Sequence, residues 1–132
     1  ARHPGAVVLA ADTVVAVGRR ILPKAEDPET AVRCLRLLSG RRHRVLTAVT
    51  VAGPGGAARH RLSSSIVRVG RLETSAIERY VAGGEWQGKA GGYAIQGSFE
   101  AHVAWMSGSF SGVMGLPLHE TRTLLGAAGL LG

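Results

Sequence analysis

Two long stretches of alternating side chains limit what this chain can fold into more than any other feature of its sequence. Within residues 43–52, β-branched side chains occupy every second position and therefore share one face of a strand. They are Val45, Thr47, Val49 and Val51. Residues 57–69 form a second extended stretch, and the intervening Gly53-Pro54-Gly55-Gly56 has the composition of a turn. The sequence therefore predicts a long β-hairpin.

The N-terminal part predicts further strands and one candidate functional carboxylate. Residues 6–11 are a short apolar run consistent with a buried strand, and Asp12 follows it directly. Catalytic groups of α/β enzymes occupy such strand ends, although an aspartate that caps a turn is an equally good interpretation. Residues 13–22 predict a hairpin, and Lys24 at its end is close enough in the chain to lie near Asp12.

Capping patterns place a helix between the two hairpins. Asp27 is a suitable N-cap, Pro28 suits the first helical position, and Gly40 suits the helix end. The only cysteine, Cys34, falls within this helix, where we expect it to be buried. Four further elements are predicted, namely a helix from 73–75 to 82, short strands over 93–95 and 102–106, and a closing helix over 118–127.

Together these elements predict an α/β fold in which helices flank a mixed β-sheet. A chain of 132 residues accommodates one domain with a modest core, so we expect residues 1–132 to form a single domain. No apolar stretch reaches the length that crosses a membrane, and no signal-peptide pattern opens the chain. The expected location is therefore the cytoplasm, with no membrane partner.

A glycine-rich stretch over residues 86–97 is the strongest candidate for a binding loop. Its glycines let the backbone turn tightly and approach a ligand closely, because no Cβ stands in the way. Lys89 adds a mobile cation, and the Gln96 amide offers both a donor and an acceptor. Such a loop suits an anionic ligand with an amide-like edge, such as a nucleotide. A loop that only turns a corner remains an alternative.

The net charge of +7 fits either a nucleic-acid-binding protein or an enzyme that handles phosphates. Lys24 and Lys89 are the only lysines, and the arginines are scattered, with the densest basic cluster at residues 41–44. No aromatic residues interleave with them to stack on bases, which favours a solvated basic surface over stable nucleic-acid binding. The five histidines lack metal-ligand spacing, and no Walker A loop, nucleophile elbow or Rossmann fingerprint is present.

Three motifs in a fixed order resemble one known family. Residues 89–97, K-A-G-G-Y-A-I-Q-G, resemble the K-A-G-x-Y-x-I-Q-G motif of the Maf family of nucleoside triphosphate pyrophosphatases. Residues 108–118, G-S-F-S-G-V-M-G-L-P-L, are similar to the G-S-Y-x-x-V-x-G-L-P-L motif of that family. Residues 11–15, A-D-T-V-V, match its third motif. The form of the first motif resembles the branch that acts on dTTP and UTP.

The resemblance implies a reaction and a role for each matching residue. Members of the family hydrolyse nucleoside triphosphates between the α and β phosphates with a divalent cation, Mg²⁺ or Mn²⁺. Asp12 would then accept the proton of the attacking water and bind the cation. Thr13 and Gln96 match positions linked to the choice of base. Lys24 and Lys89 would neutralise charge on the triphosphate. The family also implies a homodimer.

The chain departs from the family pattern at several places. Pro23-Lys24-Ala25 stands in place of G-K-P, Gly88 in place of an acidic residue, and Phe110 in place of a tyrosine. Family members carry an S-x-S-P-R-R loop well upstream of A-D-T-V-V, whereas Asp12 comes almost at once here. We therefore expect a partial domain that lacks the first strand-helix portion, and feeble or no activity from this chain.

Two alternatives from other functional classes remain open. The first is a non-catalytic regulator of septum formation, because the family has been associated with that process. It predicts that replacing Asp12 leaves the biological effect intact. The second is a basic nucleic-acid-binding module, which predicts steep salt dependence of binding.

Overall fold

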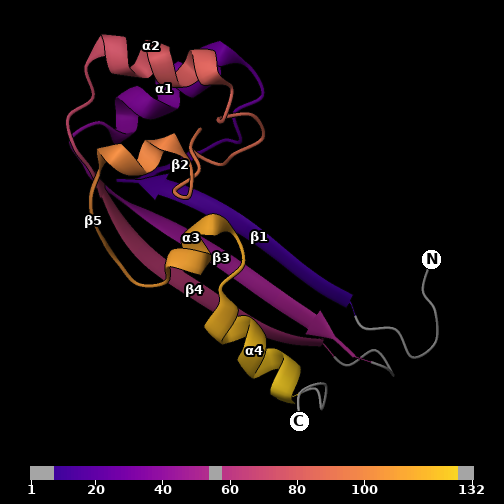
Figure 1. The fold of residues 1–132 in the computed structure, drawn as a ribbon. Coiled ribbons are helices and arrows are strands. Elements are labelled where there is room, and N and C mark those ends of the chain that lie inside the picture. Colours follow the sequence, from indigo (N-terminus) through magenta and orange to yellow (C-terminus); the bar gives the residue numbers. More distant parts are fainter. Residues whose placement is uncertain (1–7, 54–57, 128–132) are drawn as a thin grey trace.

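A computed structural model describes residues 8–53 and 58–127, and within them the chain forms one antiparallel sheet with helices packed against it. The strand order is β2-β1-β3-β4-β5. The strands are β1 (Val8–Val17), β2 (Arg20–Leu22), β3 (Arg42–Ala52), β4 (Ala58–Val69) and β5 (Val103–Ser107). The long strands β1, β3 and β4 run side by side along the length of the molecule (Figure 1). Every strand pair in this part of the chain is antiparallel.

The predicted long hairpin is confirmed, and its inward face carries the core. β3 and β4 pair from Arg42↔Arg68 to Ala52↔Ala58, and the four alternating β3 side chains that we predicted to share a face are all buried. The main core joins these strands to α1 (Pro28–Leu38) and α2 (Thr74–Gly83). A smaller cluster joins Val49 and Val51 to Leu124 of α4 (Leu118–Ala127).

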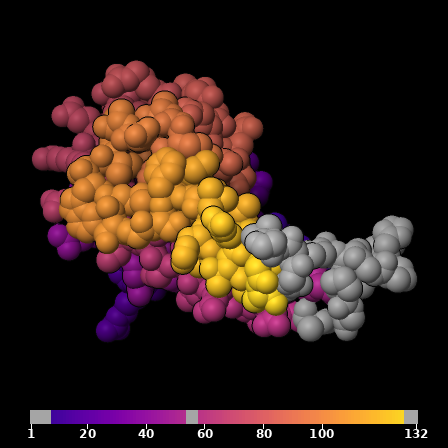
Figure 2. Space-filling model, turned by 60° about the horizontal axis from the view of Figure 1, so that its bottom comes forward, coloured from indigo at the N-terminus to yellow at the C-terminus, as the bar shows by residue number. Residues whose placement is uncertain are grey.

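Figure 1 shows the helices in two groups along the sheet. α1 and α2 lie at one end, whereas α3 (Phe110–Met114) and α4 lie over the middle and the other end, against β3 and β4. The short 3-10 helix η1 (Ser98–His102) leads into β5. Figure 2 shows the segment from the glycine-rich loop to α4, orange to yellow, as one continuous surface. Residues of the loop and of α3 line the same pocket, which places these two segments next to each other.

The capping predictions for α1 are confirmed in detail. The Asp27 side chain accepts a hydrogen bond of 2.7 Å from the backbone N–H of Thr30, Pro28 is the first helical residue, and Gly40 follows the Ser39 C-cap with a φ of +67°. The hydrogen bond to Thr30 lowers the pKa of Asp27. In α2, Glu73 is the N-cap and makes no side-chain capping bond, so the helix begins within the predicted range of 73–75.

Two local predictions were wrong, and the observed hydrogen bonding explains both of them. Residues 8–17 form one strand, so Asp12 lies within β1 and not at a strand end, and Val8–Ala11 are exposed because the short β2 pairs only with residues 15–17. Residues 93–95 form no strand, since the Ala94 N–H binds the Tyr80 hydroxyl. The predicted α/β fold with helices flanking the sheet is confirmed, and its described strands all pair antiparallel. The predicted turn at 53–56 lies largely outside the described residues.

Candidate functional site

One pocket of about 210 Å³ brings together all five residues that the sequence singled out. They are Asp12, Thr13, Lys24, Lys89 and Gln96. The pocket lies between the middle of β1, the glycine-rich loop and the end of α3. Asp12 and Gln96, which are 84 positions apart in the chain, therefore border the same pocket. This is the arrangement expected of a ligand site, where a few polar groups converge among apolar ones.

Backbone pairing places the two lysines side by side. Lys24 and Ala90 form an antiparallel bridge next to Lys89. Three further bonds close this contact: Ala25 N–H to the Lys89 carbonyl at 3.0 Å, Gly88 N–H to the Ala25 carbonyl at 2.8 Å, and Gly91 N–H to the Pro23 carbonyl at 3.1 Å. Both lysines thus stand on neighbouring backbone segments that border the pocket, where their side chains can meet an extended anion.

Buried aromatic residues fix the glycine-rich loop on the core. Trp86 donates its indole N–H to the Val81 carbonyl at 2.7 Å, and the Tyr93 ring stacks on Phe99 with centroids 4.6 Å apart. Between these anchors, Gly91 has a φ of +71°, and a Cβ there would lie 3.0 Å from Val15. Only glycine therefore allows the loop to pass this close to β1.

The side chains of Asp12 and Thr13 point to opposite faces of β1. Thr13 pairs with Thr47 and shares the buried face with it, whereas Asp12 pairs with Ala48, which is exposed. Successive side chains of a strand alternate between its faces, so Thr13 points toward α3 and Asp12 does not. Asp12 is exposed and borders the pocket at the stretch where β1 pairs only with β3 among the described strands.

Hydroxyl groups on the sheet hold α3 at the other side of the pocket. Thr47 donates to the Gly112 carbonyl at 2.7 Å, and Ser65 accepts from the Ser109 N–H at 2.9 Å. These bonds position Val113 and Met114, which line the pocket. Sequence reasoning missed these two residues, since a five-residue helix is too short to show which side chains face inward. The motif at 108–118 was the available signal.

A buried pair of side chains lies behind the pocket. His43 Nε2 is 2.5 Å from the hydroxyl of Tyr93, a pocket-lining residue, and His43 is almost fully buried on β3. Burial lowers the pKa of His43 to about 4. It raises the pKa of Tyr93 above the usual value of a phenol. Both groups are therefore neutral near pH 7, and they serve to support the loop.

The buried His43 makes stability sensitive to acid. The unfolded chain takes up a proton at His43 near pH 6.5, whereas the folded chain does so only near pH 4, so stability falls as the pH drops between these values. Between pH 7 and 4.5 this loss is about 2 kcal/mol. We expect the free energy of unfolding of His43→Leu to fall by that amount less between the two pH values. Urea unfolding at each pH measures it. The exposed His119→Leu is the control, and an equal loss in both variants would contradict the prediction.

Other candidate residues lie apart from the pocket. Glu85, which does not line the pocket, accepts hydrogen bonds from the Ser98 N–H and hydroxyl. Those bonds lower its pKa. Cys34 is buried as predicted, and desolvation raises its pKa. Over residues 8–53 and 58–127, no three His, Cys, Asp or Glu side chains group to hold a metal ion.

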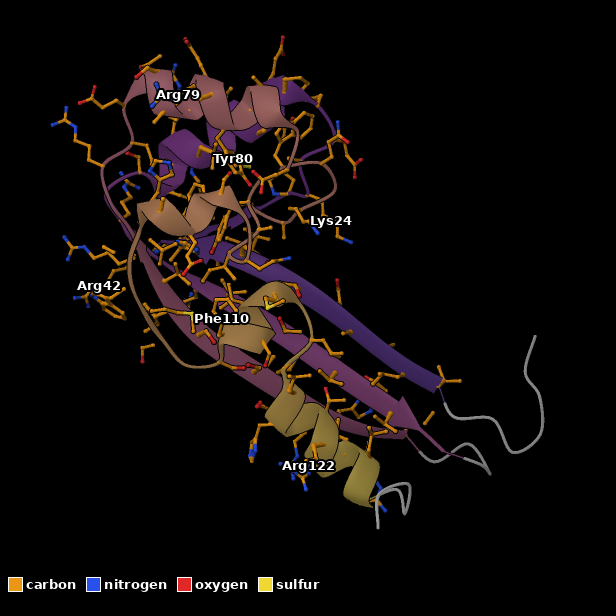
Figure 3. The ribbon with its side chains drawn as sticks, in the orientation of Figure 1. Lys24, Arg42, Arg79, Tyr80, Phe110 and Arg122 are labelled. Atoms are coloured by element: carbon orange, nitrogen blue, oxygen red, sulfur yellow. The ribbon has the colours of Figure 1, made fainter. Side chains whose placement is uncertain are left out.

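Arginines lie on several parts of the described surface, although Arg42 and Arg68 stand opposite each other on β3 and β4. Figure 3 shows Arg42 at the side of the molecule opposite Lys24, with Arg79 at the end formed by α2 and Arg122 on α4. Arg42 lies over the Trp105 ring, 5.0 Å from its centroid. This dispersion agrees with a solvated basic surface. In the part of the chain that the structure describes, no helix is long and apolar enough to span a membrane.

The fold and the pocket define an α/β protein with a polar site whose cations, carboxylate and amide suit a phosphate-bearing ligand. Comparison with known families agrees with the three motifs, because the family model described as "Maf-like protein" matches residues 1–128. The chain belongs to the Maf-like protein family.

Three relatives illustrate the similarity, and each is named dTTP/UTP pyrophosphatase. The Novosphingobium aromaticivorans protein is 66% identical over 96% of this chain and 63% of its own length. The Rhodospirillum rubrum protein is 58% identical over 97% of this chain and 61% of its own length. The Zymomonas mobilis protein is 59% identical over 97% of this chain and 63% of its own length. The chain thus spans about three fifths of the relatives that it matches.

Proposed function

We propose that the protein is a nucleoside triphosphate pyrophosphatase that hydrolyses dTTP and UTP to the monophosphate and pyrophosphate. The observation that carries the proposal is the convergence of Asp12, Thr13, Lys24, Lys89 and Gln96 on one pocket. The names of relatives that are 58–66% identical support the choice of substrates. Two cations, one carboxylate and a neutral amide are the groups that a triphosphate, an attacking water and a base require.

Each group has a defined part in the proposed reaction. Asp12 accepts a proton from water while the water oxygen bonds to the α-phosphorus. The bond between that phosphorus and the bridging oxygen breaks, and its electron pair leaves with pyrophosphate. Lys24 and Lys89 balance the charge on the phosphate oxygens. Gln96 and Thr13 face the base.

The residues present fit a substrate-borne divalent cation. Magnesium binds in proteins through one or two carboxylates together with substrate phosphates and water, and Asp12 supplies one carboxylate at the pocket. The absence of a three-ligand group among the described side chains agrees with such a cation better than with a permanently held one. When bound, the ion would neutralise charge on the triphosphate. We propose Mg²⁺ or Mn²⁺.

The test measures both binding and pyrophosphate release with dTTP, UTP, CTP and GTP in the presence of Mg²⁺. We expect tighter binding of dTTP and UTP, and slow release that depends on the added cation. Replacing Mg²⁺ with a chelator should remove the release. If the chain neither binds nor hydrolyses any of these nucleotides, the proposed function is wrong, and the non-catalytic alternatives return.

Replacing either lysine of the pair gives a separate prediction about nucleotide affinity. The side chains of Lys24 and Lys89 are exposed, and the backbone segments that carry them are hydrogen-bonded to each other. Each ammonium group should therefore add to the affinity for the triphosphate but contribute little to folding. We expect Lys24→Gln and Lys89→Gln each to weaken UTP binding roughly tenfold, while the affinity for UMP changes much less. Arg79→Gln, on α2 and outside the pocket, is the matched control. Equal losses for UTP and UMP would contradict the assignment.

A cytoplasmic location and a homodimer complete the proposal. Nucleoside triphosphates are found in the cytoplasm, and exposed apolar side chains near α3 offer an area for a second copy. They are Phe110, Leu116 and Leu118, and Figure 3 marks Phe110 on α3. Sedimentation equilibrium of the purified chain should give the mass of a dimer that Leu118→Gln weakens. A monomer at all concentrations would refute this part.

A further inference from the structure

A chain of two hydroxyl hydrogen bonds, the first partly buried and the second buried, runs from the pocket wall into α3. The Oγ1 atoms of Thr13 and Thr47 are 2.9 Å apart, and Thr47 Oγ1 is 2.7 Å from the carbonyl oxygen of Gly112. Thr47 is completely buried and does not border the pocket, whereas Thr13 does. These bonds join strands β1 and β3 to the helix that carries Val113 and Met114.

The geometry fixes where each proton lies. A carbonyl oxygen only accepts hydrogen bonds, and two oxygens at 2.7 Å repel each other unless a proton lies between them, so Thr47 must donate to Gly112. A threonine hydroxyl has one proton, and Thr47 has then none left for Thr13. Thr13 must therefore donate its own proton to Thr47. The Thr13 hydroxyl is left with only lone pairs to offer elsewhere.

We propose that Thr47 is a specificity-determining positioning residue, which makes Thr13 an obligate hydrogen-bond acceptor for the imide N–H of uracil or thymine. This inference rests on the proposed function. The uracil and thymine rings carry a fixed donor at N3, whereas cytosine carries a fixed acceptor at the same ring position. A ribose hydroxyl could rotate to suit either partner and would gain no selectivity from a fixed proton. Whether the Thr13 hydroxyl donates or accepts therefore matters most for a contact with the imide N–H of the base.

The position of Thr13 agrees with this role. Lys24 and Lys89 border the pocket from the bridged loop segments, whereas Thr13 faces the end of α3. A Cβ on Gly115 would lie 3.6 Å from Thr13 Oγ1, so the hydroxyl adjoins the end of α3. Next to it, Val113 and Met114 supply apolar wall. An apolar wall with one fixed acceptor suits the edge of a base and not a phosphate.

The experiment compares UTP and CTP binding to the chain and to variants of Thr47. In Thr47→Val the Thr13 proton loses its partner, so the hydroxyl can also donate to cytosine, and we expect the preference for UTP over CTP to shrink roughly tenfold. Thr47→Ser keeps the hydroxyl and should keep the preference. Thr50→Val is the matched control on β3, because Thr50 is bonded to His60 away from the pocket and should change nothing.

Each outcome bears on a different claim. A merely structural Thr47 would lower the affinity for UTP and CTP by the same factor, and that result, or an unchanged preference in a folded Thr47→Val protein, overturns the inference while leaving the proposed function in place. Circular dichroism and urea unfolding verify that the variant is folded. If the unaltered chain binds neither nucleotide, the proposed function fails, and this inference fails with it.

Discussion

Asp12→Asn should lower pyrophosphate release from dTTP and UTP by about 10²–10⁴-fold, which is the contribution typical of a positioned general base. The amide has nearly the same shape as the carboxylate but cannot accept the proton of the attacking water. Asp12 is exposed on β1, so we expect the fold to be unaffected. The measurement is kcat for both substrates, together with nucleotide affinity from a binding titration.

The same variant separates two roles of the carboxylate. If Asp12 also binds the cation, a higher Mg²⁺ concentration should be needed for half-maximal activity in Asp12→Asn. Asp27→Asn is the matched control, because Asp27 lies outside the pocket and asparagine is an equally good N-cap. A residual rate within tenfold of the unaltered chain would show that Asp12 is not the general base.

Gly108→Ala should lower the free energy of unfolding by about 2–5 kcal/mol. Gly108 has a φ of +114°, which strains any other residue, and a Cβ there would lie 2.6 Å from Ser65 Oγ and 2.9 Å from Ser65 Cα. Ser65 is buried on β4 and binds Ser109, so the sheet cannot yield without disturbing α3. For a small domain such a loss is a large part of total stability. Urea unfolding followed by circular dichroism measures it.

The chain contains its own control for backbone strain. Gly115 has the same φ of +114°, but a Cβ there would meet only Thr13 Oγ1 at an ordinary 3.6 Å. Gly115→Ala should therefore cost the strain alone, about 1–3 kcal/mol, and less than Gly108→Ala. Equal losses in the two variants would mean that the close approach of Gly108 to β4 contributes nothing.

Much of the fold could be predicted because local patterns carry it. The alternation in 43–52 gave the buried face of β3, and Asp27 and Pro28 gave the start of α1, since both signals act over a few residues. The continuous strand through Asp12 was missed because an apolar run does not reveal how long its pairing continues. That length depends on β3, whose partners for β1 run from Arg44 to Ala52.

The site divides in the same way between sequence and structure. The sequence by itself indicated the family and five of the residues that line the pocket, because the motifs at 11–15 and 89–97 specify four of them directly and Lys24 ends the predicted hairpin beside Asp12. Only the tertiary structure decided that Thr13 faces α3 while Asp12 does not, and that the Thr13 proton points to Thr47. Those facts follow from two hydrogen bonds, one between residues that are 34 positions apart and one between residues that are 65 positions apart. No local pattern encodes the strand register that brings such distant groups together.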